Sequence, residues 1–377
     1  MNKTKKYKIL MLLSTFGVAS GVNSFAMNYL RHVDHDKVQI DFAVYFERES
    51  PYIDEIHKYG GNTFLLPPVQ CFKKHIKACN EIIDSGNYDV IHDNSLILTI
   101  PFMLVAKRKR VPLRILHSHS TELADSRMKK VRNKLMLPIL KWTATDYAAC
   151  SSAAGKAMFK NRQYKIIPNV ITPSKYIFDE NERKFIRHKM GVEGIFVVAT
   201  VGRAAYQKNP FFAMDVFKLL LTKISNVVFW WIGNGPLEKE MLIYADQLGI
   251  SDKVFFLGKR EDVIELYQAM DCFFLPSLFE GLPLTGIEAQ AMGLPMVVSD
   301  TVTTEMVYTD LVEFVNLKGP IETWVKSLEN ALNRNINRMD YNTYLKNSHF
   351  SDANCGERLI KLYDQLLNNQ EEIYREN

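Results

Sequence analysis

Short apolar runs alternate with helical stretches twice along the chain, and this alternation limits the fold more than any other feature. In the first half the apolar runs fall at 8–13, 38–44, 63–66, 90–92, 113–117 and 146–149, with helical stretches between most of them, for example at 24–31 and 53–59. In the second half they fall at 196–202, 227–232, 254–257, 272–275 and 296–298, and helices are expected at 210–221, 236–248 and 263–269. Apolar runs of this length are typical of parallel strands buried on both faces. Strands that alternate with helices predict doubly wound α/β domains.

The length of the chain, 377 residues, favours two domains, since a domain usually has about 100–200 residues. The rhythm of strands and helices breaks at 165–173, a segment that contains Pro168 and Pro173. We therefore place the linker between the two domains near 168–182.

The five cysteines are scattered, odd in number and without C-x-x-C spacing. This argues against a disulfide framework or a zinc site and favours a reducing compartment. Basic residues up to Lys8 and the apolar run 9–13 imitate a secretory leader, but Ser14, Thr15 and Gly17 interrupt the run. We expect a first strand there and a cytoplasmic protein. No run approaches the roughly 18 apolar residues of a membrane span.

Positive charge gathers at 107–114 and at 126–142, although the net charge is only +5. The second stretch interleaves Lys and Arg with large apolar residues, as in an amphipathic helix that lies on anionic lipid. An ordinary solvated helix face and a nucleic-acid site are the alternatives. No nucleic-acid module is recognisable, and no aromatic residues alternate with the charges as a single-strand groove requires. We therefore expect peripheral contact with an anionic membrane and no nucleic acid.

Two glutamates, Glu280 and Glu288, bracket a short loop rich in Gly and Pro. The residues before the loop, 271–277, predict a buried strand, and the residues after it, 287–292, predict a helix. A strand, a tight loop and a helix N-terminus line up backbone N–H groups that bind anions. Carboxylates on both sides of such a site can hold sugar hydroxyls. The alternative is a structural pair that caps a surface loop.

Two histidines, His117 and His119, end another predicted strand of the first half. Their side chains lie on the same side if the strand continues. A metal-binding pair and a purely structural pair are both alternatives for them. The loop after the first strand, 14–25, contains Gly17 and Gly21 but not the G-x-G-x-x-G spacing. A nicotinamide site, and with it an NAD oxidoreductase, is therefore disfavoured.

Residues 275–299 resemble the signature of the retaining nucleotide-sugar glycosyltransferases of family 4. In that signature Glu, seven residues and a second Glu precede A-x-A-x-G-x-P-V, and Met296 stands here where Val or Ile is usual. Further landmarks follow in the family's order: the glycine loop at 14–25, the hinge at 168–171, the G-R-x-x-x-x-K segment at 202–208 and the G-N-G-P turn at 233–236. The resemblance covers nearly the whole chain. Within the family it points to the bacterial capsule and exopolysaccharide enzymes.

The resemblance implies the GT-B fold, in which two Rossmann-like doubly wound domains face a central cleft. It implies an acceptor-side domain at 1–170, completed by a C-terminal helix at about 355–377. It assigns 171–354 to the domain that binds the nucleotide sugar.

The resemblance also implies site residues. His119 and Glu280 would be catalytic, and His119 is favoured over His117 because the Ser-Thr that follows it matches the family's wording. Glu288 would accept hydrogen bonds from the ribose, and Glu280 would contact the donor sugar. The implied donor-binding residues are Gly21, Arg203, Lys208, Arg260, Gly281, Leu282, Pro283, Leu284, Thr285 and Glu288. Arg203 and Lys208 would neutralise a diphosphate leaving group without a metal.

The implied reaction moves a sugar from a UDP-sugar, with retention of configuration, to a saccharide or lipid-linked saccharide at the inner face of the plasma membrane. No metal cofactor is expected. One alternative is a GT-B UDP-sugar epimerase, which needs an acid/base set that the sequence does not display. Another is a non-catalytic sugar-binding protein, against which the presence of Arg203, Lys208, Glu280 and Glu288 together argues.

Overall fold

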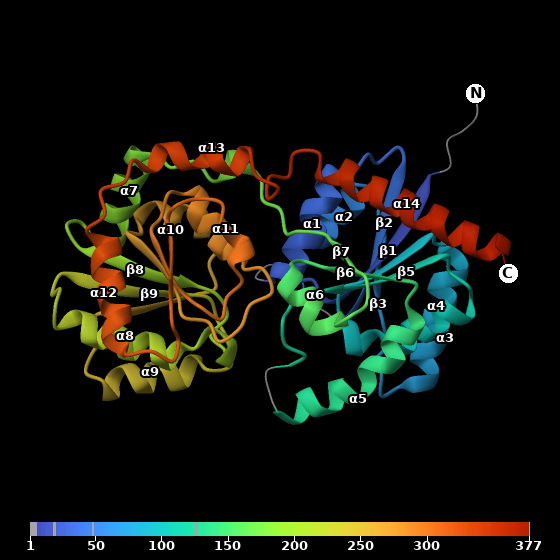
Figure 1. Cartoon of the computed structure of the whole chain (residues 1–377), viewed down its shortest axis with the longest axis horizontal. Coiled ribbons are helices and arrows are strands. Elements are labelled where there is room, and N and C mark those ends of the chain that lie inside the picture. The colour runs from blue at the N-terminus through green and yellow to red at the C-terminus, as the bar shows by residue number, and fades with distance from the viewer. Residues whose placement is uncertain (1–5, 18–19, 47–48, 125–126, 377) are drawn as a thin grey trace. The chain divides into compact units, whose positions relative to one another are not determined.

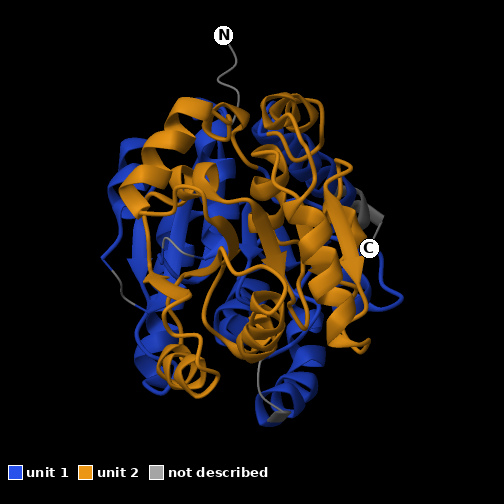
Figure 2. Ribbon diagram, turned by 90° about the vertical axis from the view of Figure 1, so that its left-hand side faces the viewer, with its two compact units in different colours: residues 1–170, 352–377 blue, residues 171–351 orange. Residues whose placement is uncertain are grey.

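The computed structural model describes residues 6–17, 20–46, 49–124 and 127–376 (Figure 1). The chain forms two compact units: unit 1 comprises residues 1–170 and 352–377, and unit 2 comprises residues 171–351 (Figure 2). Each unit contains one parallel sheet that is flanked by helices. The prediction of doubly wound α/β architecture is therefore confirmed.

The sheet of unit 1 has the strand order β3-β2-β1-β4-β5-β6-β7, and its paired strands all run parallel. The strands are β1 (Tyr7–Thr15), β2 (Val38–Phe46), β3 (Thr63–Leu65), β4 (Val90–Asp93), β5 (Leu113–Ser118), β6 (Asp146–Ala149) and β7 (Lys165–Ile166). The helices are α1 (Gly21–His32), α2 (Pro51–Lys58), α3 (Phe72–Gly86), η1 (Leu96–Thr99), α4 (Ile100–Arg108), α5 (Arg127–Thr143), α6 (Ser152–Phe159) and α14 (Cys355–Glu376). The strand order reverses between β1 and β4. Doubly wound sheets bind ligands at the carboxyl ends of the strands beside such a point.

Helix α14 comes from the end of the chain and packs into the core of unit 1. Its Cys355, Leu359, Tyr363 and Leu366 join a cluster with side chains of β1, β2 and α1. The helix approaches α1 closely because Gly356 has no side chain, and a Cβ there would lie 1.9 Å from a backbone oxygen of α1. This packing carries Tyr363 to the sheet, where it contacts β4.

The sheet of unit 2 has the order β10-β9-β8-β11-β12-β13 and is also parallel. The strands are β8 (Phe196–Val201), β9 (Val227–Ile232), β10 (Val254–Gly258), β11 (Cys272–Leu275), β12 (Met296–Ser299) and β13 (Val312–Val315). The helices are η2 (Pro173–Lys175), α7 (Glu180–Met190), η3 (Tyr206–Lys208), α8 (Pro210–Leu221), α9 (Glu238–Gln247), α10 (Val263–Ala269), α11 (Leu284–Ala291), η4 (Thr304–Met306), α12 (Ile321–Leu332), η5 (Arg338–Asp340) and α13 (Tyr341–Lys346). Here the order reverses between β8 and β11, so the loops after these two strands flank the predicted ligand site.

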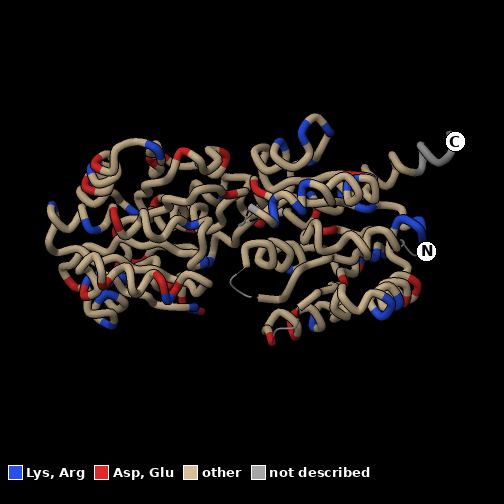
Figure 3. The backbone as a smooth tube through the Cα atoms, turned by 90° about the horizontal axis from the view of Figure 1, so that it is seen from below, with Lys and Arg blue, Asp and Glu red and all other residues tan. Residues whose placement is uncertain are grey.

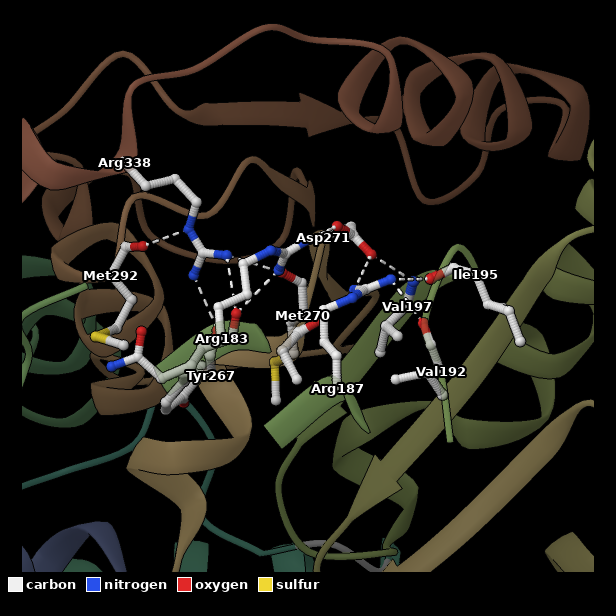
Figure 4. A network of polar contacts seen from close by, with 12 residues as sticks. Arg183, Arg187, Val192, Ile195, Val197, Tyr267, Met270, Asp271, Met292 and Arg338 are labelled. Atoms are coloured by element: carbon white, nitrogen blue, oxygen red, sulfur yellow. Dashed lines mark hydrogen bonds and ion pairs between the residues drawn. The ribbon is translucent and has the colours of Figure 1, made fainter. Parts of the chain in front are cut away.

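Three arginines tie α7, α10 and η5 to the start of β11 (Figure 4). Arg183 and Arg187 of α7 bond to the carboxylate of Asp271, at 2.5 and 3.0 Å. Arg338 donates to the carbonyl oxygen of Tyr267 at 2.9 Å and to further carbonyls at the end of α10. Burial, followed by the nearby Arg183, lowers the pKa of Arg338 to about 9. The network satisfies the free carbonyls of a helix C-terminus and so fixes α10 in place.

The predicted strands are present with bounds within two residues, but the edge strands β7 and β13 were not predicted. Both residues of β7 are exposed, and only Val315 of β13 is buried, so neither strand has a continuous apolar run. The predicted start of the helix after the Gly/Pro loop was wrong. Helix α11 begins at Leu284, directly after Pro283, and not at residue 287. Thr285 therefore lies in its first turn and Glu288 in its second.

Helix α5 corresponds to the predicted amphipathic stretch, whose first residue, Ser126, lies outside the described residues. Its buried residues, which face the unit, are Asn133, Leu137, Leu140 and Thr143. Five large apolar side chains of the same helix are 47–85% exposed: Met128, Val131, Leu135, Ile139 and Trp142. No helix in the described part of the chain is both long and apolar enough to cross a membrane. Lys and Arg elsewhere are interspersed with Asp and Glu on both units (Figure 3).

Candidate functional site

The loop between β11 and α11 carries Glu280, which is held in a buried ion pair. Its Oε1 lies 2.6 Å from Lys208 Nζ and accepts a hydrogen bond from Ser277 Oγ at 2.8 Å. Its other carboxylate oxygen accepts a hydrogen bond from Gln207 Nε2 at 2.9 Å. The side chains of Lys208 and Glu280 are only 12% and 8% exposed. These contacts join the loops after β8 and β11, which are the two loops beside the reversal in strand order.

The N-terminus of α11 follows this loop directly and offers free hydrogen-bonding groups. Pro283 precedes the helix and supplies no capping side chain. The hydroxyl of Thr285 is buried and has no hydrogen-bond partner among the described residues. The first N–H groups of a helix have no intrahelical partner and attract negative charge. An oxyanion or a ligand hydroxyl at this place would satisfy both kinds of group.

Glu288, one turn further along α11, is held by two tyrosines. Its Oε1 accepts a hydrogen bond from Tyr176 Oη at 2.8 Å, and its Oε2 accepts one from Tyr267 Oη at 3.0 Å. Burial raises the pKa of Glu288, while the two phenol hydroxyls oppose that shift. Within the described residues, no Lys or Arg forms an ion pair with this carboxylate.

The remaining predicted residues of unit 2 lie at the ends of β8 and β10. Arg203 lies two residues after the end of β8 and is exposed. Arg260 follows β10 and forms two hydrogen bonds, at 2.7 and 2.5 Å, with Asp262 of its own loop. The turn after β9 packs against the loop that bears Arg203: a Cβ on Gly233, whose φ is +129°, would lie 2.3 Å from the carbonyl oxygen of Gly202. This packing explains why glycine is required at that position.

In unit 1 the glycine loop leads from β1 into α1, which begins at Gly21. The Ser20 side chain caps this helix by accepting a hydrogen bond from the N–H of Asn23. Asn23 Nδ2 in turn donates to the carbonyl oxygens of Thr15 and Gly17, at 2.7 and 2.9 Å. Ser20 and Asn23 thus hold the loop against the end of β1. Residues 18 and 19 of this loop lie outside the described residues.

The histidines of unit 1 form a buried cluster at the carboxyl ends of β4 and β5. His92 Nδ1 lies 2.6 Å from Tyr363 Oη, and His92 Nε2 lies 3.0 Å from His117 Nδ1. The rings of His117 and His119 are tilted against each other with their centroids 4.0 Å apart. Burial lowers the pKa of His92 and His119 to about 3 and that of His117 well below its usual range. All three imidazoles are therefore neutral at pH 7.

Asn94 fixes the protonation of His119. Its Nδ2 donates to the carbonyl oxygen of His92 at 3.2 Å, so its Oδ1 faces His119 Nε2 at 2.9 Å. His119 must then carry its proton on Nε2, which leaves Nδ1 as a hydrogen-bond acceptor. His119 Nδ1, His117 Nε2 and Thr15 Oγ1 are buried, and each lacks a hydrogen-bond partner in the described structure. Buried polar groups normally have partners, so this edge of the sheet is suited to a polar ligand.

Some of these contacts were not predicted from the sequence. Gln207, Tyr176, Tyr267 and Asn94 each hold a predicted site residue, yet none belongs to the motif that pointed to it. Asn94 could have been found, because it lies two residues after the predicted strand 90–92, at the end where ligands bind. Among the described residues, no group of three or more His, Cys, Asp or Glu side chains could hold a metal ion.

Comparison with known proteins places the chain in a family. Residues 182–348 match the family described as glycosyl transferases group 1. The chain is 30% identical over 348 residues to the putative glycosyltransferase EpsF of Bacillus subtilis, a match that covers 88% of this chain and 89% of EpsF. The chain belongs to the group 1 glycosyltransferases. The predicted enzyme class is thereby confirmed.

Two further relatives are named for a lipid-diphosphate-linked sugar acceptor and for capsular polysaccharide biosynthesis. An Escherichia coli UDP-Gal:α-D-GlcNAc-diphosphoundecaprenol α-1,3-galactosyltransferase is 26% identical over 243 residues, which is 60% of this chain and 62% of that protein. The capsular polysaccharide glycosyltransferase CapH of Staphylococcus aureus is 24% identical over 221 residues, which is 55% of this chain and 59% of CapH.

Solved structures with this architecture confirm the predicted GT-B fold. Anabaena HepE in complex with UDP-glucose superposes with a TM-score of 0.77 at 16% identity, over 95% of this chain and 99% of HepE. WaaG, a glycosyltransferase involved in lipopolysaccharide biosynthesis, superposes with a TM-score of 0.74 at 15% identity, over 94% and 99% of the two chains.

Proposed function

We propose that this glycosyltransferase moves a sugar from a UDP-sugar to a saccharide or lipid-linked saccharide acceptor, with retention of configuration. The β11–α11 segment carries the proposal, because it presents Glu280, an unpaired Thr285 hydroxyl, a free helix N-terminus and Glu288 in one continuous stretch. The names of the relatives support uridine nucleotides, since one of them uses UDP-Gal and HepE was solved with UDP-glucose.

In this proposal unit 2 binds the donor. The diphosphate lies at the N-terminus of α11, where the N–H groups and the Thr285 hydroxyl receive it. Lys208 has three N–H donors and uses one on Glu280, so two remain for phosphate oxygens. Glu288 accepts hydrogen bonds from the ribose, and Glu280 contacts hydroxyls of the donor sugar. Arg203 adds a second positive charge beside the leaving group.

The acceptor is assigned to unit 1. A neutral His119 with a free Nδ1 accepts a hydrogen bond from a sugar hydroxyl, because it has no proton to give at that atom. In the transfer step the bond between the sugar C1 and the diphosphate oxygen breaks, and the acceptor oxygen bonds to C1 on the same face. The acceptor proton passes to the departing diphosphate, whose negative charge Lys208 and Arg203 stabilise.

Binding of UDP to the purified protein tests the donor assignment. Glu288→Ala should weaken UDP binding by about tenfold or more, because a hydrogen bond to a charged group is worth roughly 1.5–3 kcal/mol. Glu280→Ala should weaken it less, because UDP lacks the sugar that Glu280 contacts. Glu322→Ala on the exposed face of α12 is the control. Equal affinities for all four proteins in calorimetry would overturn these roles.

Chelation tests the metal-free expectation separately. EDTA should leave the affinity for UDP unchanged, because the proposed phosphate contacts are Lys208, Arg203 and helix N–H groups. If UDP binding is lost in EDTA and restored by magnesium or manganese, the proposal of metal-free binding is wrong.

We further propose that α5 holds the enzyme on an anionic membrane, in keeping with an acceptor that carries a lipid. At 3.6 residues per turn, its five exposed apolar side chains fall within an arc of roughly 80° on the outward face. The exposed Arg132 and Lys134 lie on the flanks of that stripe. Apolar burial at the interface and attraction of basic residues to anionic lipid add together in such a helix.

Vesicle sedimentation tests this contact. Changing Lys129, Lys130, Arg132 and Lys134 to Ser should release the protein from vesicles of anionic lipid, since each basic residue near the surface is worth about 1 kcal/mol before screening. The control removes the same charge by changing Lys184, Lys189, Lys239 and Lys326 to Ser, all exposed on helices of unit 2. If both variants and the wild type sediment equally, α5 is an ordinary solvated surface. The affinity for UDP should be the same in the α5 variant and in the control variant.

A further inference from the structure

Glu288 receives one phenol hydroxyl on each of its carboxylate oxygens. Tyr176 Oη lies 2.8 Å from Oε1, and Tyr267 Oη lies 3.0 Å from Oε2. The two tyrosines come from different elements: Tyr267 is on α10, and Tyr176 follows η2 on the segment that enters unit 2 from unit 1. The Glu288 carboxylate is therefore held by two uncharged hydrogen-bond donors, one on each of its oxygens.

Neither tyrosine is free to move away. Tyr267 is fully buried, and its backbone carbonyl accepts a hydrogen bond from Arg338 in the arginine network of Figure 4. Tyr176 is 9% exposed, and its carbonyl oxygen accepts a hydrogen bond at 2.7 Å from Asn342 Nδ2. Asn342 also donates to the carbonyl oxygen of Pro173 at 2.8 Å, so both ends of η2 are held.

We propose that Tyr176 and Tyr267 are positioning residues, which aim the Glu288 carboxylate at the two neighbouring hydroxyls of the donor's ribose. A carboxylate has about four acceptor sites, two on each oxygen. The phenols occupy one on each oxygen and leave one on each oxygen for a ligand. Two adjacent hydroxyls match this remaining pair. The inference rests on the proposed donor site and adds two residues to it.

The two tyrosines also oppose the effect of burial on Glu288: burial raises the pKa of its carboxyl group, and the two phenol hydroxyls act in the opposite direction. Burial alone would favour the protonated acid, which could accept fewer hydrogen bonds from a diol. Two hydroxyl donors stabilise the ionised form without neutralising it. A Lys or Arg in their place would hold the carboxylate equally well but would compete with the ribose for its lone pairs.

A comparison of UDP with 2′-deoxy-UDP measures this positioning. The wild type should bind UDP about tenfold or more tightly than 2′-deoxy-UDP, because the deoxy nucleotide lacks one hydrogen bond to a charged group. Tyr176→Phe keeps the ring and removes the hydroxyl, and it should reduce that ratio roughly threefold or more. Tyr267→Phe should act in the same direction. Tyr244→Phe is the matched control, since Tyr244 Oη bonds to the carboxylate of Asp215 at 2.7 Å elsewhere in unit 2.

The ratio separates positioning from a merely structural role. If Tyr176→Phe weakens UDP and 2′-deoxy-UDP by the same factor, or changes neither, Tyr176 does not position Glu288 and the inference is overturned. If the wild type shows no preference for UDP, the proposed donor site itself fails. A preference that is lost in Glu288→Gln and kept in both tyrosine variants would overturn the inference alone. Thermal unfolding of each variant confirms that unit 2 is folded during the measurement.

Discussion

Lowering the pH from 7 to 5 should destabilise unit 1 through its buried histidines, and His92 is the best place to measure this. His92 is fully buried between Tyr363 and His117, and burial lowers its pKa to about 3. In the unfolded chain a histidine has a pKa of about 6.5. A depressed pKa in the folded state means that the stability is fully present above about pH 6.5 and is lost as the pH falls toward about 3.

The magnitude follows from the difference between the two pKa values. Each pH unit below about 6.5 costs about 1.4 kcal/mol for one such histidine, so His92 accounts for about 2 kcal/mol at pH 5. Asp93 acts in the opposite direction, because burial raises its pKa to about 7 and the folded state then takes up a proton in this range. The total pH dependence mixes these groups, whereas the difference between wild type and a His92 variant isolates one of them.

Hydrogen exchange of peptides from β4 and β5 reports the free energy of unfolding of unit 1 by itself. Between pH 7 and pH 5 the wild type should lose about 2 kcal/mol more than His92→Gln, after correction for the intrinsic exchange rate. His57→Gln, which removes an exposed histidine of α2, should behave as the wild type does. If wild type and His92→Gln lose the same stability, then His92 takes up its proton in the folded state, and the reasoning from burial is refuted.

Three shorter predictions concern the packing that supports the sites. Asp271→Asn should destabilise unit 2 by roughly 3–5 kcal/mol, because Arg183 and Arg187 would lose their shared, partly buried carboxylate; urea unfolding followed by tryptophan fluorescence would show no change if the arginines are adequately solvated. Gly356→Ala should cost roughly 1–3 kcal/mol in unit 1, because its Cβ would meet a backbone oxygen of α1 at 1.9 Å; an unchanged midpoint in thermal unfolding would contradict this close approach. UDP should slow hydrogen exchange at 171–178, because Tyr176 contacts Glu288; equal exchange with and without UDP would contradict the link.

The alternation of apolar runs and helices was enough to predict the architecture, because buried parallel strands must be apolar on both faces. The pattern around Glu280 and Glu288 likewise predicted the strand–loop–helix segment that carries both residues. The edge strands β7 and β13 were missed, because exposed residues such as Lys165 and Ile166 carry no apolar pattern. The periodicity of apolar residues therefore predicts individual strands and helices, and only where a continuous apolar pattern is present.

The partners of the site residues lie beyond this local reach. Tyr176 and Glu288 are 112 positions apart, and Asn94 and His119 are 25 positions apart. Each pair is in contact because different elements converge at the carboxyl edge of a sheet. The apolar periodicity of a strand (two residues) or a helix (3.6 residues) does not predict contacts between residues so far apart in sequence. Lys208 is another residue whose contact could not be predicted from the local sequence. The sequence identified it as a positive charge for phosphate, but its ion pair with Glu280 depends on the contact between two loops.

The carboxyl edges of the two sheets differ in charge, and this difference bears on which part of the substrates each unit binds. The edge of unit 2 presents Lys208, Arg203 and a helix N-terminus, groups that suit a charged diphosphate. The edge of unit 1 presents His117 and His119, which burial keeps neutral, together with unpaired polar atoms that suit uncharged hydroxyls. A diphosphate bound at the histidine edge would gain no opposing charge from these neutral imidazoles. This contrast favours the proposal that the diphosphate binds to unit 2 and the hydroxyls of the acceptor to unit 1.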